Sequence, residues 1–255
     1  MARRKRNLHL NNYIKDDSYD PRLKVLKDSY QDKITKLQNF KLREIEAKTN
    51  NQSRTFDAFF NDKNLLLHGS AGTGKTFISL YLGLDSVLGK SPYYEVNLIR
   101  SVVPTREVGH LPGDLDKKIE VYELPYKQIV NDLCGRGDAY EILKKKGKLN
   151  FISTSFVRGV TFDNSIIIVD EIQNLSFHEL DSIMTRVGEN CKIVFCGDFR
   201  QSDLRSTTEK QGLHNFMEIL SGMKNFERIN FNQNDIVRSK LVKDYIVCKE
   251  NLNFL

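Results

Sequence analysis

Short apolar runs alternate with amphipathic stretches along most of the chain. Residues 166–169 and 193–196 are apolar without interruption, which is typical of strands buried on both faces. Between such runs, apolar residues recur at spacings of three and four, as on one face of a helix. We expect strands near residues 64–68, 95–100, 149–153, 165–169, 191–196 and 227–231, and helices near 75–89, 115–133, 138–146, 176–187, 211–221 and 236–250. This alternation predicts an α/β fold, a mostly parallel sheet with helices on both faces.

The N-terminal part follows a different pattern. Residues 1–20 are polar and predict a basic, disordered tail, and residues 21–44 predict a helical extension before the main domain, residues 45–255. The extension could pack on the core or on a neighbouring subunit, because its apolar residues repeat at helical spacing: Leu23, Leu26, Tyr30, Ile34 and Leu37.

The next helix has a recognisable start. Thr49 and Gln52 are spaced as in a capping box, and we expect the buried face of this helix to consist of Phe56, Phe59 and Phe60.

Composition narrows the class of protein. The chain has 255 residues, 40% of them hydrophobic, which suffices for one α/β domain with a proper core. No apolar stretch approaches the roughly 20 residues of a membrane span, and no apolar segment of a secretory signal follows the basic start. The four cysteines are scattered, so we expect a cytoplasmic, reduced protein without a structural zinc site or a membrane partner. Cys191 and Cys196 flank an apolar strand and are expected to be core thiols.

The positive charge is concentrated at one end. The net charge is +6, but the first fifteen residues contain five basic residues and no acid, so the remainder is nearly neutral. The tail is equally compatible with a solvated arm and with a nucleic-acid contact.

A glycine-rich segment carries the strongest chemical signal. It matches the phosphate-loop pattern G-x-x-x-x-G-K-[ST] and lies between an apolar run and a helical pattern. Its residues are Gly69, Ser70, Ala71, Gly72, Thr73, Gly74, Lys75 and Thr76. Backbone N–H groups of such a loop point at phosphate oxygens, Lys75 would reach the β- and γ-phosphates, and the Thr76 hydroxyl would bind Mg²⁺. The alternative is an ordinary glycine-rich turn.

Two carboxylates follow another apolar strand. Asp170 would hold Mg²⁺ directly or through a water, and Glu171 could polarise the attacking water as general base. The pattern alone is weak, since many strands end in an acid. Together with the phosphate loop it favours hydrolysis over phosphoryl transfer to a small molecule.

Two further residues are candidates for catalysis. Gln201 follows the apolar run 193–196 and could bond both the γ-phosphate and the water, or could simply belong to a turn. Arg238 opens the last predicted helix and could stabilise developing charge as an arginine finger, or could lie on the surface.

Five segments together resemble the PhoH-like ATPases in order and spacing, a family related to the first motor domain of superfamily 1 helicases. They are the phosphate loop, Arg100 to Asp114, Phe156 to Gly159, Asp170 to Asn174, and Gly197 to Asp203. The resemblance implies a RecA-like core that hydrolyses ATP with Mg²⁺, and a link to RNA metabolism and phosphate starvation. It also implies that Gln52 reads adenine and that Arg238 belongs to the family's late arginine element.

The chain lacks the length for the second motor domain of those helicases or for the nuclease domain of some relatives. We therefore expect a homo-oligomer, such as a hexameric ring, in which a neighbouring subunit acts as the second lobe. The first hypothesis is an ATP-dependent motor, remodeller or helicase on RNA or single-stranded DNA. Its candidate contacts are the tail and Arg100, Arg106, His110 and Arg158.

A second hypothesis is a nucleotide-driven regulator of protein partners without a nucleic-acid track, and a third is a metabolite kinase. The sequence leaves open the physiological substrate, RNA against DNA, the polarity of movement, the ring size, and whether Arg238 acts in cis or in trans.

Overall fold

The computed structural model describes residues 40–89, 91–102, 115–199 and 207–252, with only the backbone at 115–118 and 207–210. Contacts divide the chain into two units, Met1–Lys41 and Leu42–Leu255, and the fold below is that of the second. The predicted tail and the helical pattern at 21–38 lie outside the described residues, as do Arg106, His110 and Gln201.

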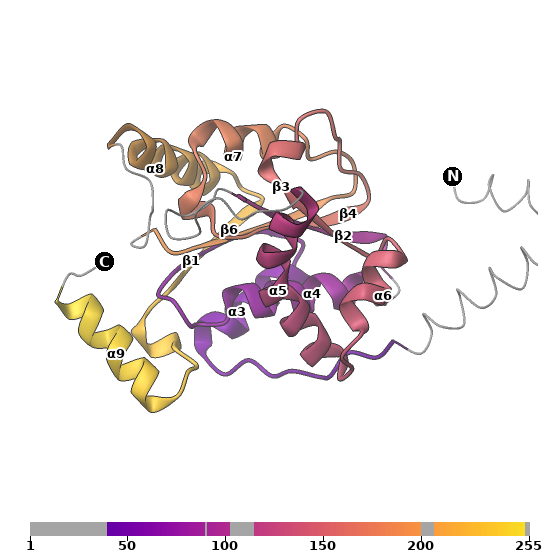
Figure 1. The fold of residues 1–255 in the computed structure, drawn as a ribbon. Coiled ribbons are helices and arrows are strands. Elements are labelled where there is room, and N and C mark those ends of the chain that lie inside the picture. Colours follow the sequence, from indigo (N-terminus) through magenta and orange to yellow (C-terminus); the bar gives the residue numbers. More distant parts are fainter. Residues whose placement is uncertain (1–39, 90, 103–114, 200–206, 253–255) are drawn as a thin grey trace, which may run out of the picture. The chain divides into compact units, whose positions relative to one another are not determined.

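A six-stranded parallel sheet forms the centre of this unit (Figure 1). Its strands are β1 (Asn64–Gly69), β2 (Glu95–Arg100), β3 (Leu149–Ser153), β4 (Ser165–Val169), β5 (Lys192–Gly197) and β6 (Phe226–Phe231). They lie in the order β3-β2-β4-β5-β1-β6, and every neighbouring pair is parallel. The sheet confirms the predicted fold class, a RecA-like P-loop architecture, and all six expected strands.

Helices cover both faces of the sheet. The α-helices are α3 (Asn50–Phe60), α4 (Lys75–Leu88), α5 (Leu115–Cys134), α6 (Ala139–Lys145), α7 (Phe177–Met184), α8 (Thr207–Gly222) and α9 (Lys240–Asn251), and the short 3-10 helices are η1 (Thr154–Phe156), η2 (Ile172–Asn174) and η3 (Gln233–Asp235). Figure 1 shows α3 to α6 on one face and α7 and α8 on the other. On the second face, β4 and β5 pack on these helices through Val169, Phe195, Leu180 and Phe216, which removes apolar surface from water. The sheet is thereby held with its carboxyl edge open for a site.

Helix α3 begins at the predicted place with one of the two capping-box bonds, and it buries a different face. The Thr49 side chain accepts a hydrogen bond from the Gln52 N–H at 3.3 Å, and Phe59 is buried. The prediction for Phe60 is wrong, because its side chain is 63% exposed. The buried face instead includes Thr55, which shares a helix face with residues 52 and 59 at spacings of three and four.

Two helix boundaries differ from the predicted ones for local reasons. α7 ends at Met184 because the following residues turn to pair with residue 162, where Phe162 N–H donates to the Arg186 carbonyl at 2.9 Å. α9 begins only at Lys240 because residues 233–235 form η3, whose capping box joins Asn232 and Asp235.

The cysteines and the apolar character of the helices test two predictions from composition. All four cysteines are free; Cys196 is buried as predicted, whereas Cys191 is only half-buried. Among the described helices, none combines the length and apolar character that crossing a membrane requires.

Candidate nucleotide and metal site

The phosphate loop joins the end of β1 to the start of α4, and its backbone conformation depends on glycine. Gly69, Gly72 and Gly74 have φ angles of 117°, 72° and 85°, in the region that side chains disfavour. A Cβ on Gly69 would lie 1.9 Å from the Phe231 carbonyl oxygen on neighbouring β6. Backbone geometry therefore requires glycine at these positions of the motif.

Lys75 lies at the centre of this loop. Its Nζ donates to the carbonyl oxygens of Gly69 and Ser70, both at 2.8 Å, and to Thr73 Oγ1 at 3.3 Å. Burial lowers the pKa of Lys75, and attraction to Asp198 opposes that shift. A phosphate oxygen in the loop would replace weak neutral acceptors of this ammonium by a charged one.

Thr76 and Asp170 meet although 94 residues separate them in the sequence. Thr76 Oγ1 donates to Asp170 Oδ1 and Oδ2 at 3.0 and 3.1 Å. A hydroxyl and a carboxylate side by side are hard oxygen ligands that fit Mg²⁺. Burial, followed by the neighbouring Glu171, raises the pKa of Asp170, so a divalent cation would stabilise its ionised form.

The protein does not supply a complete metal cage here. Within the described ranges, no cluster of three or more His, Cys, Asp or Glu side chains could hold a metal ion. An ion at Thr76 and Asp170 would thus take its other ligands from phosphates and water, as Mg²⁺ commonly does.

Asp170 has a second hydrogen-bond donor that sequence reasoning missed. The Tyr126 hydroxyl on α5 donates to Asp170 Oδ2 at 2.9 Å, and Arg100 Nη1 donates to that hydroxyl at 3.2 Å. The Arg100 guanidinium also lies over the rings of Tyr122 and Tyr126, 5.6 and 5.8 Å from their centroids. Arg100 is therefore linked to Asp170 through the Tyr126 hydroxyl, and its role as a nucleic-acid contact stays a prediction.

Gln173 connects the ends of β4 and β5. Its Nε2 donates to Glu171 Oε2, and its Oε1 accepts from the Asp198 N–H at 3.1 Å. Glu171 itself has φ 55°, which is unusual for a residue with a side chain and common at functional sites. The position of Gln173 two residues after Glu171 was the only sequence signal for this role.

Gln52 contacts the phosphate loop directly. It is buried; its Nε2 donates to the Thr73 carbonyl at 3.0 Å, and its Oε1 accepts from the Lys48 N–H at 2.8 Å. A primary amide has two N–H donors and two acceptor positions on its oxygen, so these two bonds leave one donor and one acceptor position of Gln52 for a ligand.

Arg238 lies over the phosphate loop of its own chain. The neighbouring Val237 N–H donates to the Gly72 carbonyl at 3.0 Å, and a Cβ on Gly72 would lie 2.9 Å from Arg238 Cγ. Arg158, by contrast, is exposed and does not contribute to this site.

One open cavity of 1450 Å³ brings these groups together, and we name it the phosphate-loop cavity. Its lining includes Gln52, loop residues 71–76, Arg100, Asp170, Glu171 and Arg238. The predicted phosphate, metal, adenine and finger residues thus line one cavity, except for Gly69 and Ser70, which do not line it, and Gln201, which is not described.

Comparisons with known proteins agree with this geometry. The model of the PhoH-like protein family matches residues 44–249. The PhoH-like protein of Bacillus subtilis (strain 168) is 31% identical over 232 residues, 91% of this chain and 71% of that protein. Protein PhoH of Escherichia coli (strain K12) is 30% identical over 77% of this chain and 56% of its own length, so the present chain spans only part of its relatives.

Solved structures show a weaker similarity. The large terminase of a thermophilic bacteriophage in complex with ADP has a TM-score of 0.47 at 13% identity, over 77% of this chain and 48% of that one. The Pif1 helicase of Candida albicans has a TM-score of 0.42 at 18% identity, over 82% and 44% of the two chains.

Proposed function

Because this chain belongs to the PhoH-like protein family, we propose that it binds ATP with Mg²⁺ and hydrolyses it to act on single-stranded nucleic acid, as a homo-oligomer. The observation that carries the nucleotide part is the contact between Thr76 and Asp170 next to Lys75. It joins the two halves of a metal–triphosphate site from distant parts of the chain. The same residues serve a hydrolase better than a binding module, since Glu171 adds a second carboxylate beside the first.

In this proposal each side chain has one task. Lys75 and the loop N–H groups bind the β- and γ-phosphates, and Thr76 and Asp170 hold the metal ion, which neutralises charge that develops on the phosphates. Glu171 takes the proton of the attacking water, and Gln173 keeps that carboxylate in place through its Nε2. Arg238 stabilises the charge of the transferring phosphoryl group, and Gln201 remains the predicted γ-phosphate sensor.

The proposal that the nucleotide is ATP rests on Gln52, which could recognise the adenine base. Its amide lies at the loop with a donor and an acceptor, and amides can pair bidentately with adenine. A preference for ATP over GTP would follow from that pairing.

Oligomerisation is supported by the exposed face of α9. Among the described side chains of this helix none is buried, and Leu241 and Tyr245, four residues apart, are 80% and 67% exposed; Leu252, the residue after the helix, is 64% exposed. Contiguous exposed apolar residues mark interaction sites. Because α9 follows directly after Arg238, a subunit docked there would lie near the phosphate loop.

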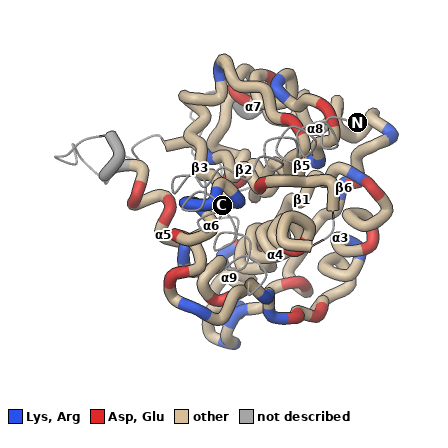
Figure 2. Tube along the Cα trace, turned by 90° about the vertical axis from the view of Figure 1, so that its right-hand side faces the viewer, with Lys and Arg blue, Asp and Glu red and all other residues tan. Residues whose placement is uncertain are grey.

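The same helix supports the second candidate function, a nucleotide-driven regulator that acts on protein partners. Figure 2 shows Lys and Arg interspersed with Asp and Glu along the described chain in the view drawn. These charges do not by themselves favour either candidate, so the two need an experiment to separate them.

That experiment is ATP turnover with and without poly-RNA and single-stranded DNA, at several salt concentrations. A nucleic-acid motor should be stimulated, and the stimulation should weaken with salt because phosphate contacts release counterions. A regulator of protein partners should hydrolyse ATP at one rate in all conditions. Lys75→Ala serves as the background control, since it removes the cation that binds the β- and γ-phosphates.

A further inference from the structure

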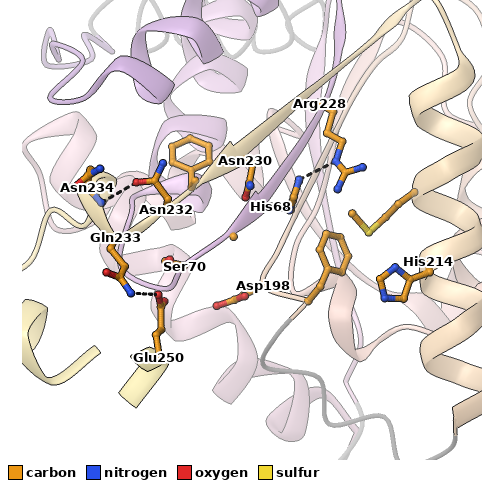
Figure 3. Close-up of a pocket in the computed structure, with 14 residues that line it drawn as sticks. His68, Ser70, Asp198, His214, Arg228, Asn230, Asn232, Gln233, Asn234 and Glu250 are labelled. Atoms are coloured by element: carbon orange, nitrogen blue, oxygen red, sulfur yellow. Dashed lines mark hydrogen bonds between the residues drawn. The ribbon is translucent and has the colours of Figure 1, made fainter. Parts of the chain in front are cut away.

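A second hollow lies on the other side of the phosphate loop (Figure 3). It has a volume of 640 Å³ and lies at the carboxyl ends of β1, β5 and β6, bordered by α8 and η3. Ligands of open α/β sheets bind at this edge. We name it the amide cleft, after the side chains Asn230, Asn232, Gln233 and Asn234 that line it.

One wall of the cleft presents basic groups. Arg228 Nε donates to His68 Nε2 at 2.9 Å, and the His68 ring packs on Phe199 with centroids 5.3 Å apart. His68 is only 7% exposed, so this bond fixes an exposed guanidinium to a buried support. His214 of α8 lines the same side of the cleft in Figure 3. A guanidinium held in this way is suited to bind a phosphate group bidentately.

The opposite wall presents amides. Asn232, Gln233 and Asn234 lie at the η3 end of the cleft in Figure 3, and Gln233 Nε2 donates to Glu250 Oε2 at 3.0 Å. Asn230 lies beside His68 on β6, two residues after Arg228. Amide groups offer a donor and an acceptor together, which is the pattern that base edges require. Two carboxylates also line the cleft: Glu250 accepts from Gln233, and Asp198 attracts Lys75.

We infer that the amide cleft binds one nucleotide unit of a single-stranded polynucleotide, with the phosphate on Arg228 and His214 and the base on the amide wall. This inference rests on the proposed function and names its nucleic-acid contact. A polynucleotide is favoured over a free nucleotide because Arg228, Asn230, Asn232 and His214 are all exposed, so a chain can enter and leave the cleft.

The cleft also adjoins the hydrolytic site. Gly69 and Ser70 line the cleft whereas residues 71–76 line the phosphate-loop cavity, and Asp198 lines both. The Asp198 N–H donates to Gln173, which in turn contacts Glu171. Two hydrogen bonds therefore link Asp198, which lines the cleft, to Glu171, the proposed general base. This link provides a route by which a bound polynucleotide could stimulate hydrolysis.

The test measures binding of fluorescein-labelled oligo-U and oligo-dT to the full chain by anisotropy across a salt series. Arg228→Gln removes the charge and keeps a donor for His68. It should weaken binding about tenfold and reduce the salt slope by about one. Asn230→Asp places a negative charge in the cleft and should also weaken binding. The matched control is Arg136→Gln, whose exposed arginine pairs with Asp138 at the end of α5, on the other face of the sheet.

Thermal unfolding of each variant shows that it is folded before its affinity is compared. Parent-like affinity and salt slope in both cleft variants would overturn this inference and leave the proposed function intact. A parent protein that binds neither oligonucleotide at low salt would overturn the nucleic-acid part of the proposed function itself. If free UMP or AMP displaced the oligonucleotide as effectively as unlabelled oligo-U, the cleft would be a mononucleotide site, contrary to the inference.

Discussion

Gln52 shows how one buried amide can serve two purposes. It anchors the phosphate loop through Thr73 and the preceding segment through Lys48. The capping pattern at Thr49 indicated a helix start, and only the family resemblance suggested a contact with adenine. The anchoring bonds could not be predicted, because they depend on how α3 packs against the loop.

Replacement of this amide separates the two roles. Gln52→Ala should reduce the preference for ATP over GTP by about 1–3 kcal/mol, because one bidentate base contact is lost. Loss of the anchor would weaken both nucleotides alike and leave their ratio unchanged. The measurement is the affinity for each nucleotide by competition with a fluorescent analogue. An unchanged ratio would mean that Gln52 only anchors the loop.

Other single residues show where sequence patterns stop being informative. The phosphate-loop residues could be assigned by motif, since their spacing alone requires the turn and the glycines. Tyr126 could not, because its partner Asp170 lies 44 residues away in the sequence and no local pattern links them. Arg100 was predicted to contact nucleic acid, but its stacking on Tyr122 and Tyr126 could not be predicted, since these are tertiary contacts.

At the scale of elements, α5 supports Asp170, the proposed metal ligand at the end of β4. Tyr126→Phe removes the hydroxyl that donates to Asp170 and keeps the ring that packs near Phe151. The Mg²⁺ concentration needed for half-maximal ATP binding should rise severalfold, because the carboxylate loses a positioning bond. ATP binding in EDTA should change little, which distinguishes positioning from a loss of structure.

Tyr140→Phe is the matched control for that experiment. Tyr140 is also buried and donates to a carboxylate, Glu123 Oε2 at 3.2 Å, away from the site. Equal Mg²⁺ dependence in both variants would contradict a specific role for Tyr126.

Hydrogen bonds to Asp235 also connect α3 with η3. Asp235 Oδ2 accepts from Asn51 Nδ2 at 2.8 Å and from the Asn232 N–H at 2.9 Å. Burial alone would raise the pKa of Asp235, but these hydrogen bonds outweigh it and lower the pKa. Asp235→Ala should therefore reduce the free energy of unfolding by about 1–3 kcal/mol at neutral pH.

The sign of its pH dependence follows from the lowered pKa. The stabilisation is complete above the pKa of an unfolded aspartate, about 3.9, and is lost as the pH falls through the lower folded value. Urea unfolding of the parent and variant from pH 7 downward should show a constant difference that shrinks only below about pH 4. Asp138→Ala, at an exposed ion pair, is the control and should change stability little. A difference that vanished already near pH 6 would contradict the assignment.

The elements themselves were largely predictable, and the deviations have local causes. The buried strands β4 and β5 each contain an uninterrupted apolar run, residues 166–169 and 193–196, and this signal does not depend on tertiary contacts. The end of α7 and the start of α9 were misplaced because a bridge at Phe162 and a capped turn at Asn232 compete with the helix. Helical periodicity contains no information about such competitors.

At the scale of the whole molecule, the placement of Arg238 bears on how subunits cooperate. Because its side chain lies over Gly72 of its own chain, we expect the finger to act in cis. An excess of Lys75→Ala subunits mixed with Arg238→Ala subunits should then show no recovery of ATP turnover, once subunit exchange has been demonstrated. Recovery of activity in the mixed assemblies would show that the finger acts in trans.

The overall charge illustrates the limit of composition as a guide. A net charge of +6 suggested nucleic acid, yet most of the excess lies in the first fifteen residues, outside the described structure. In the described part, the basic residue that we propose to bind a polynucleotide is Arg228, and no run of charged residues in the sequence indicates it. Its support by His68 arises only because β1 and β6 are neighbours in the sheet.

The most direct test of the account is single-turnover hydrolysis of ATP by Glu171→Gln beside the parent protein. The account predicts that the variant binds Mg²⁺–ATP with parent-like affinity, because Thr76, Asp170 and Lys75 are retained. It should hydrolyse the bound ATP at least about 100-fold more slowly, because the proton acceptor is lost. Parent-like turnover in this variant, or a parent that binds ATP without hydrolysing it in the presence of Mg²⁺ and single-stranded RNA, would contradict the claim that this site is an ATPase.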